Sequence, residues 1–154
     1  MTNREIAAVF DQIAELLEIE DDNPFRVRSY RRVAEAIRGL GRDLADIREA
    51  GELEDIPGVG EAIAAKIEEL LDTGDLAYLR RLESRYPKDF LDLLSVPGVG
   101  PKRAAMFLRE LGIGSVDELR AAAEAGRLRD LPGMGEKSEA RLLQALDAWS
   151  AGGG

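Results

Sequence analysis

Apolar residues recur every three to four positions along most of the chain, and this spacing predicts helices. In the segment 5–19, Ile6, Phe10, Ile13 and Leu17 share one face, as in a helix that buries one side. The same periodicity predicts further helices over 25–37, 44–50, 61–72, 76–85, 89–94, 101–111, 115–125 and 136–149. No segment alternates apolar and polar residues as a half-buried strand would. The sequence therefore predicts an all-α fold, a compact helical bundle.

Glycines and one proline mark the ends of these helices. Gly51, Gly74, Gly112 and Gly126 follow predicted helices where C-terminal caps belong, and Pro101 occupies a first helical position, where its missing N–H is harmless. The stretch 76–87 joins two parts of the chain. We expect one helical subdomain over 1–80, a second over 81–149 and a flexible tail over 150–154, whose final glycines we leave out of the fold argument.

One short motif repeats along the chain. Pro57-Gly-Val-Gly60 returns as Pro97-Gly-Val-Gly100, and again with one change as Pro132-Gly-Met-Gly135. Each copy follows a short apolar stretch and precedes a predicted helix, so one supersecondary unit recurs about every 35 to 40 residues. This repetition predicts three hairpins, each ending at the N-terminus of a helix.

Such a hairpin has the features of an anion site. The first glycine (Gly58, Gly98, Gly133) can take the positive φ of a tight reversal, and the second (Gly60, Gly100, Gly135) lets a partner approach without a Cβ in the way. The turn directs free N–H groups and the positive end of a helix dipole at one point. The alternative is a plain tight turn between packed helices. This alternative gains weight in the third copy, where Glu139 stands in place of the small Ala64 and Ala104.

Composition restricts the chemistry. The chain has no His and no Cys, which excludes disulfides, thiolate nucleophiles, imidazole bases and the usual zinc sites. Its net charge of −9 argues against a diffuse attraction to nucleic acid, but the stretch 24–42 holds six arginines against Glu35 alone, so any such contact should be local. No apolar run is long enough for a membrane span, and the first residues lack a signal core. We therefore expect a cytoplasmic protein with no membrane partner.

Four segments carry a resemblance to a known family: Asn23-Pro-Phe-Arg-Val-Arg-Ser-Tyr-Arg-Arg32, the stretches 56–67 and 96–102, and Leu111-Gly-Ile113. In order and spacing, the chain up to about Trp149 resembles the N-terminal part of bacterial and archaeal family X DNA polymerases, relatives of DNA polymerase beta. The resemblance implies helix-hairpin-helix motifs in a lyase-type subdomain, followed by a fingers-type subdomain that grips duplex DNA. The polymerase palm would lie downstream. We therefore expect an N-terminal fragment or excised module without polymerase activity.

The resemblance also implies roles for individual residues. The hairpin glycines would bind DNA phosphates without reading sequence, and Lys102 and Lys137 would add charge to the second and third hairpins, where the first has Ala62. Positions that match phosphate-binding and helper groups hold Arg26, Tyr30 and Arg31. A solvated helix face is the alternative for the neighbouring Arg28 and Arg32.

Lys66 aligns with the lysine that forms a Schiff base when the lyase subdomain removes a 5'-deoxyribose phosphate. Lys66 lies at the margin of an apolar stripe, where desolvation and nearby arginines would favour a neutral, nucleophilic amine. The alternative is a lysine that extends from the edge of the core to water. The chain departs from the family pattern at Phe25, Ala62, Ala65 and Tyr78, which would leave the 5'-phosphate pocket with fewer ligands.

The resemblance further implies a monovalent cation, Na+ or K+, at each of the first two hairpins, held by the backbone carbonyls of Ile56 and Val59 in the first and of Val96 and Val99 in the second. No cofactor would be required for binding. The preferred interpretation is a sequence-nonspecific DNA-binding module for gapped or nicked duplex with a 5'-phosphate, with 5'-deoxyribose phosphate lyase activity through Lys66 as a second hypothesis. The competing interpretation is a non-enzymatic helical scaffold or protein-interaction module. The sequence does not specify the oligomeric state, and a monomer is the default.

Overall fold

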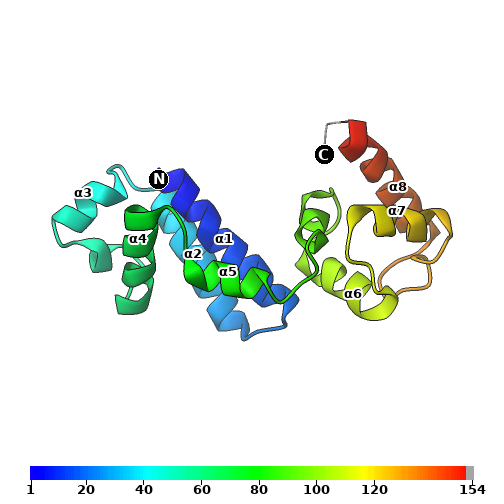
Figure 1. Ribbon diagram of the computed structural model, residues 1–154, viewed down its shortest axis with the longest axis horizontal. Coiled ribbons are helices and arrows are strands. Elements are labelled where there is room, and N and C mark those ends of the chain that lie inside the picture. Colours follow the sequence, from blue (N-terminus) through cyan, green and yellow to red (C-terminus); the bar gives the residue numbers. More distant parts are fainter. Residues whose placement is uncertain (152–154) are drawn as a thin grey trace. The chain divides into compact units, whose positions relative to one another are not determined.

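The computed structural model describes residues 1–151 and confirms the all-α prediction, because these residues contain only helices, turns and connecting segments (Figure 1). The chain divides into two compact units, Met1–Glu83 and a second that begins at Ser84. The first unit contains α1 (Asn3–Ile19), α2 (Pro24–Arg38), α3 (Leu44–Glu49), η1 (Leu53–Asp55), α4 (Glu61–Thr73) and α5 (Ala77–Glu83). The second contains η2 (Phe90–Ser95), α6 (Pro101–Leu111), α7 (Val116–Glu124) and α8 (Glu136–Ala151).

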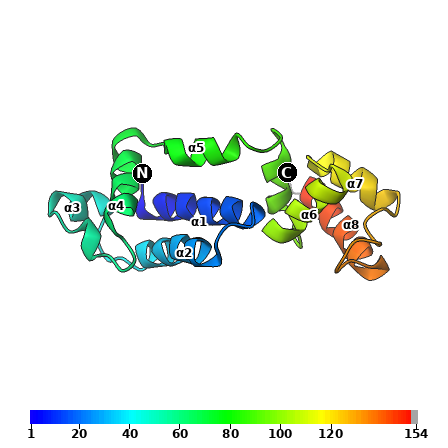
Figure 2. The ribbon, with the colours of Figure 1, turned by 90° about the horizontal axis from the view of Figure 1, so that it is seen from below.

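Helix α1 is the centre of the first unit. It contacts both α2 and α5, and Figure 2 shows it lying between them. Its predicted apolar stripe is buried, and Phe10 stacks on Tyr30 of α2 with ring centroids 6.1 Å apart. Helices α3 and α4 lie near the N-terminal end of α1 (Figures 1 and 2). Burial of one face of each helix therefore builds this core.

The helices begin and end where polar side chains and glycines allow it. Helix α1 begins two residues before the predicted segment because Thr2 accepts a hydrogen bond from the Glu5 N–H while the Glu5 carboxylate accepts one from the Thr2 N–H. Helices α4 and α6 end at Gly74 and Gly112, whose φ angles of 75° and 66° lie in the left-handed region. The glycine caps predicted at these two ends are thus confirmed.

In the second unit, η2 contacts α6 and α7, and α7 contacts α8. Its core is formed by fully buried side chains, Phe90, Leu93, Phe107, Leu119, Leu128 and Leu146. The predicted tail over 150–154 falls mostly outside the described residues, since α8 runs to Ala151.

The segment 89–94, predicted as an α-helix, is instead the 3-10 helix η2. The unpredicted 3-10 helix η1 occupies the same place in the first unit. Each is followed by one residue in extended conformation, Ile56 or Val96, and then by the turn proline. Because a residue before proline avoids the α conformation, the chain closes a short, tight turn there instead of continuing an α-helix.

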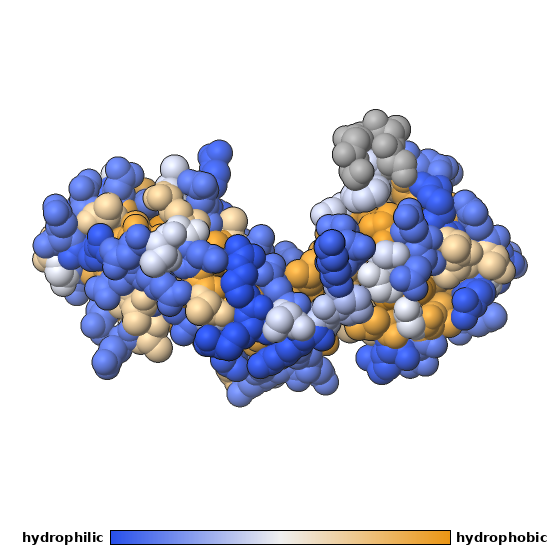
Figure 3. Space-filling view, in the orientation of Figure 1, coloured by the Kyte–Doolittle hydropathy of each residue, from blue (hydrophilic) through white to orange (hydrophobic). Residues whose placement is uncertain are grey.

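The surface is predominantly polar on the face shown in Figure 3. Among the described residues the only large hydrophobic side chains classed as exposed are Met1 and Phe25. Within this part of the chain, no helix combines the length and the apolar character that a membrane span requires.

Candidate nucleic-acid interface

The three Pro-Gly-X-Gly turns have the same backbone structure. In each, the first glycine has a positive φ: 84° at Gly58, 89° at Gly98 and 75° at Gly133. The residue after it donates its N–H to the carbonyl three positions earlier, at 3.0 Å in all three copies (Val59 to Ile56, Val99 to Val96, Met134 to Leu131). This is a reversal with proline at its second position and glycine at its third, which only glycine adopts without strain.

The second glycine of each turn begins a helix whose first N–H groups are free. Gly60 and Gly100 are the N-cap residues of α4 and α6 and provide no side-chain cap. In each hairpin helix, the first backbone hydrogen bond runs to the carbonyl of the second glycine from the N–H four residues later. Its length is 2.9 Å in all three copies (Ala64 to Gly60, Ala104 to Gly100, Glu139 to Gly135). In the first hairpin the N–H groups of Gly60, Glu61 and Ala62 therefore have no acceptor among the described residues.

Space outside the second glycines is open. A Cβ built on Gly60, Gly100 or Gly135 would meet no atom within 4 Å. Gly60 and Gly100 are exposed, while the apolar residues between the glycines, Val59 and Val99, are buried. An oxyanion can therefore approach the free N–H groups without displacing protein atoms, and the helix dipole adds to its attraction.

Charge near the turns differs from copy to copy. Lys102 and Lys137 are exposed in the first turns of α6 and α8, and Ala62 is exposed at the equivalent position of α4. The second and third hairpins can therefore add a cation beside a bound phosphate, whereas the first relies on its main chain.

The acid in the third hairpin faces the protein rather than the turn. Glu139 is 2% exposed, and one of its carboxylate oxygens accepts hydrogen bonds from the N–H groups of Leu128 and Arg129, both at 3.0 Å. The other oxygen accepts two bonds from the Arg129 guanidinium. Burial alone would raise the pKa of Glu139, but the hydrogen bonds and charge of Arg129 and the two backbone bonds lower it overall. The negative charge is thus compensated inside the fold, and the third turn keeps the geometry of the other two.

Most arginines of the basic stretch 24–42 are already paired. The salt bridges join Arg26 to Asp22, Arg31 to Glu18, Arg38 to Asp11 and Arg42 to Glu52. The Arg28 guanidinium lies 4.7 Å from the centre of the exposed Phe25 ring. Carboxylates of α1 and of the segments around it therefore offset much of the charge of this stretch, which its own composition did not indicate.

Lys66 belongs to a cluster around Tyr78. Its ammonium nitrogen lies 5.0 Å from the centre of the Tyr78 ring, and the guanidinium carbons of Arg26 and Arg81 lie 5.8 Å and 5.9 Å from it. Arg26 also donates a hydrogen bond to the Tyr78 hydroxyl, and Tyr30 stacks on Tyr78 with centroids 6.4 Å apart. Helices α2, α4 and α5 thus bring three cations to one aromatic ring.

This environment changes the acidity of two members of the cluster. Burial lowers the pKa of Lys66 below its usual value, the charge of Arg26 lowers it further, Glu69 opposes the change and Arg81 adds to it. Burial raises the pKa of Tyr30, and the neighbouring Tyr78 adds to this increase. Lys66 is half-buried. The cluster can therefore bind an anion and carry an amine that loses its proton more readily than a surface lysine.

The sequence indicated Tyr78 only as a departure from the family pattern and did not indicate Arg81. The structure makes Tyr78 the centre of the cluster and adds Arg81 one turn further along α5. The spacing of these two residues, which places them on one face of a helix, was the signal available in the sequence.

The carbonyl groups expected to hold Na+ or K+ differ in whether they accept a hydrogen bond. Those of Ile56 and Val96 accept the turn hydrogen bond, whereas those of Val59 and Val99 accept no hydrogen bond among the described residues. Carbonyl oxygens suit hard cations, so the carbonyl of Val59 fits this role in the first hairpin and that of Val99 fits it in the second. Over residues 1–151, no group of three or more acidic side chains has an arrangement that could hold a metal ion.

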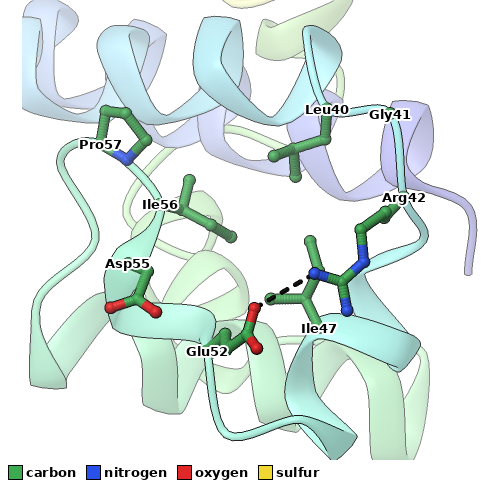
Figure 4. Close-up of a pocket in the computed structure, with 8 residues that line it drawn as sticks. All are labelled: Leu40, Gly41, Arg42, Ile47, Glu52, Asp55, Ile56 and Pro57. Carbon is green, nitrogen blue, oxygen red and sulfur yellow. Dashed lines mark hydrogen bonds and ion pairs between the residues drawn. The ribbon is translucent and has the colours of Figure 1, made fainter.

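A hollow of about 200 Å³ lies beside the first turn, between Leu40–Arg42, Ile47, Glu52 and Asp55–Pro57 (Figure 4). Its polar lining consists of Glu52, Asp55 and Arg42, and Arg42 is paired with Glu52 at 3.1 Å. The two carboxylates make this hollow unsuited to a phosphate.

Two families match the chain in turn. The helix-hairpin-helix domain family matches residues 1–76, and the SAM-like helix-hairpin-helix tandem family matches residues 90–148. Together the two matches include all three turns.

Two DNA polymerases and a subunit of a Holliday junction complex are among the proteins to which the chain is similar. The chain is 33% identical over 146 residues to the DNA polymerase/3'-5' exonuclease PolX of Bacillus subtilis, a match that covers 95% of this chain and 25% of PolX. It is 28% identical over 122 residues to DNA polymerase lambda of Rattus norvegicus, covering 79% of this chain and 20% of that protein. It is 39% identical over 57 residues to the Holliday junction branch migration complex subunit RuvA of an Acidovorax species, covering 37% of this chain and 30% of RuvA. The chain thus spans about a quarter of the length of these curated relatives.

Proposed function

Because the chain belongs to the helix-hairpin-helix proteins and matches the N-terminal region of the family X DNA polymerases, we propose that it is a sequence-nonspecific DNA-binding module for gapped or nicked duplex. The observation that carries the proposal is the repeated turn, in which an open second glycine leaves the N–H groups of a helix N-terminus without acceptors. Three such turns offer three places for a strand phosphate.

Main-chain donors explain why binding should not depend on sequence. An N–H group at a helix N-terminus reaches phosphate oxygens, which are the same at every nucleotide, whereas sequence is read at the edges of the bases. The exposed lysines Lys102 and Lys137 would add charge to such contacts without adding base recognition.

The net negative charge of the chain restricts the proposed contact with DNA to particular sites on its surface. The chain carries a net charge of −9, and four arginines of the segment 24–42 are held by carboxylates. Long-range attraction to DNA should therefore be weak, and affinity should come from phosphates seated at the turns.

A gap or nick supplies a group that intact duplex lacks, a terminal 5'-phosphate. The cluster of Arg26, Lys66 and Arg81 around Tyr78 offers three cations for this dianion. Arg26 and Arg31 each have a carboxylate partner, Asp22 and Glu18, but Arg26 also lies against Tyr78 beside Lys66, so we assign capture of the 5'-phosphate to Arg26 and its neighbours at Tyr78.

A binding titration tests this function. Fluorescently labelled duplexes with a one-nucleotide gap, with a nick and without interruption are titrated with the protein at two salt concentrations. We expect tighter binding to the interrupted duplexes and weaker binding at the higher salt concentration, with a 5'-hydroxyl version of the gap as control. Equal affinity for all substrates would contradict recognition of the gap, and absence of salt dependence would contradict phosphate binding.

Lysis of a 5'-deoxyribose phosphate is the second candidate function, and the lowered pKa of Lys66 favours it. The neutral amine would attack the C1' aldehyde of the open sugar and release water, giving an imine that makes a C2' proton acidic. Loss of that proton would break the C3'–O bond and leave the electron pair on the departing phosphate oxygen. Water would then hydrolyse the imine and regenerate the lysine.

Borohydride trapping on a 5'-deoxyribose phosphate substrate tests the lyase. The protein should form a covalent adduct with the DNA, and Lys66→Ala should not form it. Lys88→Ala provides a control, because Lys88 is an exposed lysine of the other unit. No adduct with the unaltered protein would rule out the lyase without affecting the DNA-binding proposal.

We also propose one Na+ or K+ at the free carbonyl of Val59 and another at that of Val99, where each cation would bridge its own turn and a bound phosphate. Replacing K+ with tetramethylammonium at equal ionic strength should weaken DNA binding, because the larger ion does not fit a carbonyl site. Unchanged affinity would argue against the cation.

A further inference from the structure

A second hollow lies in the unit that begins at Ser84, beside the second turn. It has a volume of about 150 Å³ and joins that turn to α8, the helix of the third hairpin. Its lining is formed by Pro97, Gly98, Arg103, Ser138, Arg141 and Leu142. The hollow is therefore bordered by the two hairpins of one unit.

Both charged residues in this lining are arginines. The Arg103 guanidinium donates to the Gly98 carbonyl at 3.1 Å, which fixes it against the wall of the turn. Arg141 is exposed, and neither guanidinium has a carboxylate partner among residues 1–151.

Three other arginines of the same unit differ from this pair because each is held by a carboxylate. Arg109 is bound to Glu110, Arg120 to Asp147 and Arg129 to Glu139. In an acidic chain, two unneutralised guanidinium groups facing one small hollow are an arrangement that an anion would stabilise.

We propose that this hollow binds a phosphate group through Arg103, Arg141 and Ser138. Guanidinium groups bind phosphate oxygens through paired N–H donors, and the half-buried Ser138 hydroxyl provides one more donor. Pro97 and the buried Leu142 form the apolar part of the lining.

The site extends the proposed function, which assigns phosphate contacts in this unit to the main chain and to Lys102 and Lys137. It rests on that function for its source of phosphate, a DNA strand. Gly98 lines the hollow and Gly100 presents the free helix N-terminus on the same turn. A strand seated at Gly100 would therefore bring a neighbouring phosphate to Arg141, so the second hairpin would hold two phosphates of one strand.

The first arm of the test uses DNA and the full chain. We expect Arg141→Gln to lower affinity for gapped duplex and to reduce the slope of log K against log salt by roughly 0.9, the value for one phosphate contact. Arg141→Lys should recover most of the slope because it keeps the charge. Arg109→Gln serves as the matched control, since Arg109 lies in the last turn of α6, away from its N-terminal hairpin. A slope for Arg141→Gln equal to that of the unaltered protein overturns the proposal while leaving the proposed function intact.

The second arm uses inorganic phosphate without DNA, so that it is independent of the proposed function. The side-chain Nε–H resonances of Arg103 and Arg141 are followed by NMR during a phosphate titration, with Arg109 as an internal control. Saturable shifts of the first two and not of the third support the site. If the protein then fails to bind DNA, the source of its ligand is a free phosphate compound. Absence of shifts, or equal shifts at all three arginines, overturns the site.

Discussion

The ammonium of Lys66 and the ring of Tyr78 lie 5.0 Å apart, although they come from different helices, α4 and α5. A ring face favours the protonated amine, whereas burial and the charge of Arg26 disfavour it, and the pKa of Lys66 is lowered overall. Reactivity of Lys66 should therefore depend on the neighbours that lower its pKa.

Replacing Arg26 with Gln should raise the pKa of Lys66. Two positive charges, those of Arg26 and Arg81, lower this pKa, and the substitution removes the one with the larger effect. Reductive methylation with labelled formaldehyde, followed by NMR titration of the dimethylamine, measures this pKa directly. Arg32→Gln on the same helix is the matched control, since Arg32 does not contribute to the shift. A pKa that rises equally in both variants would contradict the assigned role of Arg26.

The same shift affects stability. Because the pKa of Lys66 in the folded protein lies below the unfolded value of 10.5, the unfolded state binds more protons between the two values. The contribution of Lys66 to the free energy of unfolding should therefore increase as pH rises through this window. Urea unfolding measured across alkaline pH should show this increase in the unaltered protein relative to Lys66→Met. Parallel pH profiles for the two proteins would contradict this.

The two glycines of each turn should respond differently to alanine. Gly58 has a φ of 84°, and a Cβ there would lie 3.4 Å from Cγ2 of Val33, so Gly58→Ala should cost about 1–2 kcal/mol of stability. Gly60 and Gly100 have φ angles of −97° and −93° with open space outside, so Gly60→Ala and Gly100→Ala should unfold at nearly the same temperature as the unaltered protein.

The Gly60→Ala and Gly100→Ala variants should nevertheless bind gapped DNA more weakly, because the added methyl occupies the approach to the free N–H groups. Thermal unfolding and the DNA titration together separate the two effects. Unchanged affinity in a normally folded Gly60→Ala, Gly100→Ala double variant would indicate that the turns serve folding alone, as a helical scaffold requires.

Glu139→Ala should destabilise the second unit by roughly 1–3 kcal/mol, because the N–H groups of Leu128 and Arg129 lose a buried acceptor. The pKa of Glu139 is lowered from 4.5, so its stabilising contribution is complete above that value and is lost as pH falls through the folded pKa. Acid unfolding should accordingly show a smaller pH dependence in Glu139→Ala. The variant Glu136→Ala provides the control, because Glu136 is the more exposed partner of Arg129 and its salt bridge is longer, at 3.4 Å.

Charge at the second helical residue of each hairpin should tune DNA affinity without altering the fold. Lys102→Glu should weaken binding and reduce the salt dependence, and Ala62→Lys should increase the salt slope by roughly 0.9 as it adds one phosphate contact. Lys88→Glu gives the same change in net charge away from the predicted contacts. A protein-interaction module would be indifferent to all three, so the DNA titration also distinguishes the competing interpretation.

Local signals in the sequence predicted most of the fold. The spacing of Ile6, Phe10 and Ile13 indicated the buried face of α1, and the glycines marked the ends of α4 and α6, because both signals depend on neighbours within one helix. The 3-10 helix η1 was not predicted, and η2 was predicted as a helix of the wrong type, because segments of 3 and 6 residues contain too few apolar positions to define a face.

Interactions between distant residues were not predictable in the same way. The repeated glycines indicated the turns, but the sequence did not show that Glu139 faces Leu128 and Arg129, or that Glu18 neutralises Arg31. Nor did the sequence show that Lys66, Arg26 and Arg81 lie around the ring of Tyr78. Each of these depends on how helices pack, and a charge count over a segment carries no information about partners outside it.

The corner shared by the three repeats has donors that belong to the main chain, so a substitution removes one of them only where it introduces a proline, as Pro101 does in the second hairpin. The residues around the donors can vary more freely, and this chain contains both a lysine at 102 and an alanine at 62. The affinity for DNA can thus change during evolution while the mode of binding stays the same. The donors at these corners are main-chain groups and not side chains that could read a base edge, so no preference for particular bases can develop there.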